Sequence, residues 1–207
     1  MSVQVCGDTH GLPSCFRKLN TTEWPEQKEL CSDDLLIILG DFGLIFEIVS
    51  TAEEEWWLNW LLNKRCTVAF LDGNHENFHR LKYFPVTKKW GGNVQIIKSK
   101  GDKCIYHLMR GQVYTIEGRK IFTMGGAKST DRGIERLGLD WWPEETPNYE
   151  EWQEADKNLK LHDNKVDSIL THTGPSSILK EMKIGGAERI NDPTAMSLEH
   201  IKTFERN

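Results

Sequence analysis

The sequence lacks several features that define common classes of protein. Its 207 residues contain no apolar run near the length of about 20 residues that spans a bilayer, and the first ten residues show no basic segment followed by an apolar stretch. We therefore expect no membrane span, no secretory signal and a cytoplasmic location. No repeat, low-complexity segment or linker rich in Pro, Gly and Ser divides the chain, which predicts a single domain over residues 1–207.

The sequence also lacks the motifs of several reactive and metal-binding sites. It has no H-E-x-x-H and no G-x-S-x-G, which argues against the metallopeptidases and acyl hydrolases that use them. Its five cysteines are an odd number without a C-x-x-C pair, so we expect reduced thiols rather than a disulfide framework or a zinc finger. The net charge of −5 gives no general attraction to nucleic acid or anionic lipid, which disfavours a nuclease without excluding it.

Polar residues follow directly on three short apolar segments. The segments cover residues 3–5, 34–39 and 67–71, and each has the length and composition of a β-strand. A helix predicted over residues 53–65 has acids in its first turn and bases in its last, and connects the second segment to the third. This order predicts a β-α-β crossover, and hence a sheet with parallel strands and helices on its faces. The polar residues at the three strand ends are Asp8, Asp41, and Asn74 with His75.

The second half of the chain contains shorter extended runs. Residues 94–98, 104–109, 112–116 and 120–124 are separated by glycines, which predicts a meander. A segment rich in Trp and acidic residues leads into a helix that ends near Leu161. A fourth buried strand over residues 167–171 then ends at His172.

The polar clusters offer chemically compatible metal ligands. Carboxylate, amide and imidazole groups suit divalent cations, and Asp8 and His10 form a D-x-H pair. A glycine precedes Asp41, whose two oxygens could bridge a pair of metals, and G-N-H-E supplies Asn74. Ligands bind outside the carboxyl ends of parallel strands, so we expect the four strand ends to converge on one crevice.

The motifs D-x-H, G-D, G-N-H-E and T-H-x-G-P, in this order over about residues 3–175, resemble the signature of the calcineurin-like metallophosphoesterases, in particular small bacterial or phage-type metallophosphatases. The resemblance implies an α/β fold, a four-layer αββα sandwich of two mixed sheets flanked by helices, with the metal site at the carboxyl ends of the strands. It implies two divalent ions, manganese first and iron, zinc or magnesium as alternatives. Its ligands would be Asp8 and His10 on metal one, Asp41 bridging, and Asn74 and His172 on metal two.

The function implied by the resemblance is hydrolysis of a phosphodiester or phosphomonoester, with a small phosphoester or a nucleotide as substrate. A metal-bridging hydroxide would attack phosphorus directly. His75 would act as an outer-sphere acid or stabilise the transition state, with Asp8 as its partner.

The sequence departs from the family after His172. The family's G-H-x-H, which supplies one more histidine to each metal, is missing, and the later His200 lies in a helical pattern without the glycine. A chain shortened at its C-terminal end would explain this. It also leaves open an alternative function, a catalytically weak protein that keeps the fold as a binding or interaction module.

The sequence offers four candidate substrate-binding residues. Lys128 and Arg132 could hold a phosphate or could be solvated loop charges. Trp141 and Trp142 lie in a predicted loop. The pattern is equally compatible with simple packing and with a lid or base-stacking platform. A base-stacking platform would favour a nucleotide hydrolase or nuclease. A further tryptophan cluster at helical spacing should pack against the sheet, and consists of Trp56, Trp57 and Trp60. The oligomeric state stays undetermined.

Overall fold

The computed structural model describes residues 2–129, 136–184 and 186–201. The six-stranded sheet has the order β1-β2-β3-β6-β5-β4, and a three-stranded sheet has the order β7-β8-β9. The strands of the first sheet are β1 (Val3–Cys6), β2 (Leu35–Leu39), β3 (Thr67–Leu71), β4 (Val86–Lys89), β5 (Gly92–Lys100) and β6 (Lys103–Leu108). Those of the second are β7 (Gln112–Ile116), β8 (Arg119–Met124) and β9 (Ser168–Thr171).

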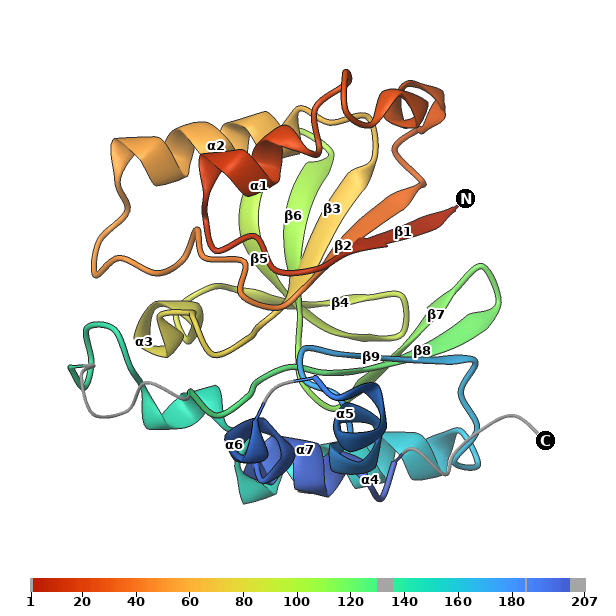
Figure 1. The fold of residues 1–207 in the computed structure, drawn as a ribbon. Helices are drawn as coiled ribbons and strands as arrows, with labels where there is room; N and C mark the ends of the chain where they lie inside the picture. Colours follow the sequence, from red (N-terminus) through yellow and green to blue (C-terminus); the bar gives the residue numbers. More distant parts are fainter. Residues whose placement is uncertain (1, 130–135, 185, 202–207) are drawn as a thin grey trace.

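Helices cover the outer faces of both sheets (Figure 1). On the side of the six-stranded sheet lie α1 (Pro13–Arg17) and α2 (Ala52–Leu62). On the side of the three-stranded sheet lie α4 (Tyr149–Leu161), α5 (Ser176–Met182), α6 (Ala187–Ile190) and α7 (Pro193–Leu198). Short helical segments are α3 (Phe78–Leu81), η1 (Pro25–Glu29) and η2 (Pro143–Glu145). The predicted four-layer sandwich of two mixed sheets is confirmed.

The alternation of side chains along β2 shows how the layers hold together. Leu36 and Ile38 pack with the residues of α2, while Leu35 and Ile37 belong to a second apolar cluster between the two sheets. A third cluster, which includes Phe122 of β8, lies between the second sheet and helices α4 and α7. Because successive strand residues point to opposite faces, one fully apolar strand can serve two layers of core.

The predicted crossover is confirmed, since β2 and β3 pair in parallel on either side of α2. Thr51 caps α2 by accepting a hydrogen bond from the Glu54 backbone N–H. Asn148 and Glu151 form a capping box at the start of α4. Helix α2 ends at Leu62, before the end predicted for the helix over residues 53–65.

Two sequence predictions about the fold are wrong. The four extended runs do not form one meander: β5 and β6 join the first sheet, where β6 pairs in parallel with β3, while β7 and β8 form a hairpin in the second. Of the three helical tryptophans, Trp57 is buried and Trp60 partly buried, but Trp56 is 58% exposed. The buried apolar residues of α2 are Trp57, Leu58, Leu61 and Leu62, and at helical spacing they define a face opposite to position 56.

No helix within the described part of the chain combines the length and the apolar character needed to cross a membrane.

Candidate metal centre

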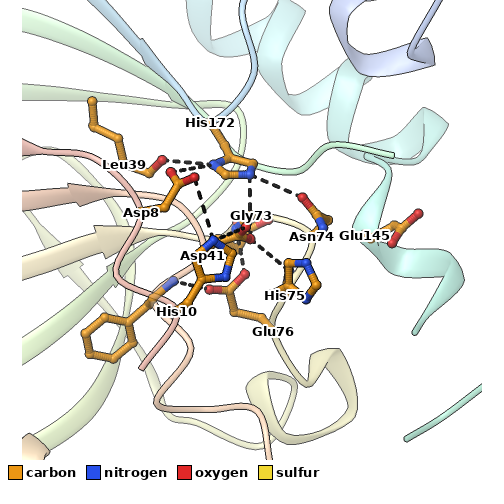
Figure 2. Close-up of polar contacts among 12 residues, drawn as sticks. Asp8, His10, Leu39, Asp41, Gly73, Asn74, His75, Glu76, Glu145 and His172 are labelled. Carbon is orange, nitrogen blue, oxygen red and sulfur yellow. Dashed lines mark hydrogen bonds and ion pairs between the residues drawn. The ribbon is translucent and has the colours of Figure 1, made fainter. Parts of the chain in front are cut away.

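Four strand ends meet at one place, as the sequence predicts (Figure 2). Asp8, Asp41 and Asn74 follow β1, β2 and β3 of the first sheet, whereas His172 follows β9 of the second. His172 reaches the other residues because the two sheets pack face to face. The crevice is therefore built by two sheets rather than by the single open sheet from which we predicted it.

Two motif glycines are required by the close approach of ligands. A Cβ atom on Gly40, whose φ is +96°, would lie 2.1 Å from Nδ1 of His172. A Cβ atom on Gly73 would lie 2.1 Å from Oδ1 of Asp41. Both distances are far below van der Waals contact, so each glycine of the G-D and G-N-H-E motifs makes room for a ligand of another strand.

Two of the predicted ligands have strained backbone conformations. His10 has φ of 49° and Asp41 has φ of 43°, values that residues with a side chain rarely adopt. The carbonyl oxygen of Asp41 accepts hydrogen bonds from the backbone N–H groups of His10 at 2.7 Å and Thr9 at 3.1 Å. Such strain persists where the surrounding structure imposes it, which is typical of functional sites.

The hydrogen bonds of His172 determine which of its nitrogens can bind a metal. Nδ1 lies 3.0 Å from the carbonyl oxygen of Leu39, which only accepts, so Nδ1 carries the proton. In the neutral ring Nε2 then presents a lone pair, and it lies 3.3 Å from Oδ1 of Asn74 and 3.5 Å from Oδ1 of Asp41. A metal-binding histidine commonly donates its other N–H to a backbone carbonyl in this way.

A chain of hydrogen bonds fixes the orientation of the Asn74 amide. Nδ2 of Asn74 donates to Oγ of Ser129 at 3.2 Å. The Ser129 hydroxyl donates to Oε2 of Glu145 at 2.6 Å, and its backbone N–H donates to Oε1 at 2.9 Å. Since the hydroxyl proton points to Glu145, Oγ can accept from Asn74, and Oδ1 of Asn74 turns toward His172. Sequence reasoning missed Ser129 and Glu145, which no motif marks.

A second group of ligands lies on the other side of Asp41. Nε2 of His10 is 3.5 Å from Oδ2 of Asp41 and 3.9 Å from Oδ2 of Asp8. His75 lies beside this group, because its ring centroid is 5.2 Å from that of His10 and its backbone N–H donates to Oδ1 of Asp41 at 2.8 Å. Asp8 contacts His10 and His172, so the Asp8 to His75 pairing expected from the resemblance does not match these contacts.

Two buried carboxylates behind the ligands hold the loops in place. Glu76 accepts hydrogen bonds of 2.6 Å from the backbone N–H groups of Phe42 and Gly73, which ties the loop after β2 to the loop after β3. Burial, together with the charges of Asp41 and Asp72, raises the pKa of Glu76 well above its usual range.

Asp72 shows the opposite shift. Burial alone would raise the pKa of Asp72, but the attraction of Arg110 and His107 outweighs this and holds the pKa below its usual range. Nε of Arg110 donates to Asp72 at 2.7 Å, and Gly126 donates its backbone N–H to the Asp72 carbonyl. The loop that presents Asn74 is thus anchored from its first residue.

The donor set fits divalent metal ions. Oxygens of Asp41 and Asn74 and Nε2 of His172 converge, an arrangement that a cation would stabilise. An ion with bonds of about 2.1 Å holds neighbouring ligand atoms about 3.0–3.5 Å apart. The separations of 3.3 and 3.5 Å from Nε2 of His172, and of 3.5 and 3.9 Å from Nε2 of His10, lie close to that spacing.

The remaining predicted residues lie away from the ligands. Lys128 has an exposed side chain, while its backbone N–H donates to Asp192. Arg132 lies outside the described residues. Trp142 is completely buried against Phe46, with ring centroids 5.8 Å apart, so it has no face open for stacking on a base; Trp141 is partly buried. The packing alternative applies to Trp142, because its large apolar surface closes the core beside Phe46 and His79.

The comparison with protein families decides the assignment. A family model described as calcineurin-like phosphoesterase matches residues 1–193. The chain belongs to this family. A calcineurin-like phosphoesterase binds divalent metals and acts on phosphoesters, and the residues gathered here supply the donors for such metals. Searches of curated proteins and of solved structures find no match to the chain.

Proposed function

We propose that this calcineurin-like phosphoesterase hydrolyses phosphodiesters or phosphomonoesters with two divalent cations, Mn²⁺ first. The main support is the position of Asp41, whose Oδ2 faces His10 and whose Oδ1 faces His172. One carboxylate thereby serves two groups of ligands, the arrangement expected of a bridging ligand. When bound, two such cations lower the pKa of water and neutralise charge on a phosphoryl group.

Each residue has a defined task in this proposal. Asp8 and His10 would hold one cation, Asn74 and His172 the other, and Asp41 both. His75 would donate a proton to the oxygen of the departing alcohol, a contribution of typically ~10²–10⁴-fold in rate. The Ser129 hydroxyl and Glu145 would keep the Asn74 oxygen aimed at its cation.

The experiment is hydrolysis of p-nitrophenyl phosphate and bis-p-nitrophenyl phosphate by protein loaded with Mn²⁺. We expect turnover of at least one substrate, and its loss in Asp41→Asn. The matched control is Asp140→Asn, because Asp140 lies in a surface segment and pairs with Arg136. Absence of turnover in a preparation shown to contain two metals per chain would count against the proposal.

A second candidate is a binding module with weak or no catalysis. The same preparation separates the two, because a binding module would show weak or single metal binding and no turnover. The nuclease and nucleotide alternative loses its support from Trp142, whose ring is buried.

A further inference from the structure

A cleft of about 480 Å³ opens beside the ligand group of His10 and His75. Its floor is the contact between the loop after β1 and the loop after β2, where Gly11 donates its backbone N–H to Phe42. One side is formed by the residues that lead into α1, and the other by the segment that leads into α2 and by the first turn of that helix.

Apolar side chains form part of the cleft wall. Leu12 is 49% exposed, Leu44 is buried, and Phe46 is partly buried. The ring of Phe46 contacts His75, at a centroid distance of 6.2 Å, and Trp142, at 5.8 Å. Because the buried Trp142 packs edge-to-face on this ring, Phe46 gives the cleft a fixed aromatic face next to His75.

The charged side chains of the cleft are acidic. Glu47 and Glu53 are exposed, and Glu54 is buried and paired with Arg80 at 2.7 Å. Of the described residues that line the cleft, none is a lysine or an arginine. Glu47 and Glu53 therefore contribute a negative potential at the cleft, which disfavours an anionic group next to them and favours a cationic one.

We propose that this cleft binds the leaving group of the substrate and selects a neutral or cationic alcohol with an apolar or aromatic body over an anionic one. The inference rests on the proposed function, since it places the departing oxygen next to His75, which lines the cleft. In the reaction, the bond from phosphorus to the alcohol oxygen breaks and a bond from phosphorus to a water oxygen forms. The alcohol leaves with a proton, and the phosphate product keeps the oxygen of water.

The test uses two phenyl phosphates that differ in one substituent, a para trimethylammoniomethyl group or a para sulfonate group. We expect kcat/KM to favour the cationic substrate by about tenfold at low salt, the size expected of two exposed carboxylates. The double variant Glu47→Gln with Glu53→Gln should bring this ratio down by most of that factor. Intrinsic reactivity cancels, because the ratio is compared between variants.

The matched control is Glu55→Gln. Glu55 lies in the same first turn of α2 as Glu53 but pairs with Lys98, and it does not line the cleft. This variant loses one carboxylate outside the cleft, whereas the double variant loses two within it, and it should keep the wild-type ratio. The preference should also shrink between 10 mM and 500 mM salt, because screening lengths fall from about 30 Å to a few ångströms.

Binding of the two product phenols, measured by calorimetry on the same proteins, separates this inference from the proposed function. Preferential binding of the cationic phenol by the wild type, lost in the double variant, supports the inference even if no substrate turns over. The absence of turnover would then contradict only the proposed function. Equal kcat/KM ratios in wild type and double variant, or equal binding of the two phenols to wild type, would overturn it.

Discussion

Replacement of Glu145 by glutamine should weaken metal binding more than removal of the Ser129 hydroxyl, although Ser129 lies nearer the metal ligands. Both Glu145 oxygens accept hydrogen bonds from Ser129, and this leaves Oγ free to accept from Asn74. In Glu145→Gln, one oxygen becomes an NH₂ group that donates to Oγ. The Ser129 hydroxyl must then point its proton at Asn74, whose amide would rotate to offer Oδ1 and withdraw it from His172.

The expected magnitudes follow from what each change does to the Asn74 amide. Ser129→Ala removes the hydroxyl's bond to Glu145 and the one hydrogen bond that Asn74 donates to Ser129. The latter is a neutral bond of about 0.5–1.5 kcal/mol, which corresponds to roughly 2–10-fold in metal affinity. Glu145→Gln turns a metal ligand away, and loss of such a supporting interaction typically costs 10–100-fold. The reversal of hydrogen-bond polarity, rather than distance from the metal, therefore decides the order of the two effects.

The assay is titration of metal-free protein with Mn²⁺, with thermal unfolding of the metal-free variants to verify folding. Glu144→Gln is the matched control, since Glu144 is a neighbour in η2 that pairs with Lys82 at the surface. A double-mutant cycle adds Asn74→Asp, whose two oxygens are equivalent, so Ser129→Ala should cost little in that background. An equal cost of Ser129→Ala in both backgrounds, or a smaller cost of Glu145→Gln than of Ser129→Ala, would refute the reasoning.

Two further substitutions test the packing around the site and in the core. Gly40→Ala should displace the His172 ring and abolish metal binding at that site. The control is Gly91→Ala, at a similar φ of +87° with open space around it, which should lower stability without affecting metal binding. Equal loss of metal in both variants would contradict this. Burial lowers the pKa of Lys64 from 10.5 to about 8. Between these pH values the unfolded chain therefore binds more protons than the folded one. The free energy of unfolding should rise by about 1–2 kcal/mol over this range. Denaturation of Lys64→Met should lack this part of the rise, and an identical pH dependence in both proteins would show that the prediction is wrong.

The sequence predicted which residues converge at the strand ends better than it predicted their surroundings. Asp8 and Asp41 could be found because an apolar strand followed by a polar turn is a local pattern, readable without the fold. Ser129 and Glu145 could not be found in this way, because Ser129 lies 55 residues from Asn74 in the sequence and Glu145 lies 16 residues from Ser129. Their positions depend on how the second sheet packs, which no short motif encodes.

The same limit explains the errors in the fold. Four extended runs with similar local patterns were assigned to one meander, although tertiary packing divides them between two sheets. Strand β4 (Val86–Lys89) was missed because all four of its residues are exposed, so it shows no alternation of apolar and polar positions. Trp142 lies in a segment that looks like a loop in sequence, yet its burial depends on contacts with Phe46 and His79 from other segments.

The most direct measurement is the number of Mn²⁺ ions bound per chain, determined by equilibrium dialysis and metal analysis of the wild type and of Asp41→Asn. Because Asp41 faces both groups of ligands, we predict two ions in the wild type and loss of both in Asp41→Asn, with Asp140→Asn unchanged. A wild type that saturates with a single ion, or an Asp41→Asn variant that keeps both, would contradict a dinuclear centre bridged by Asp41.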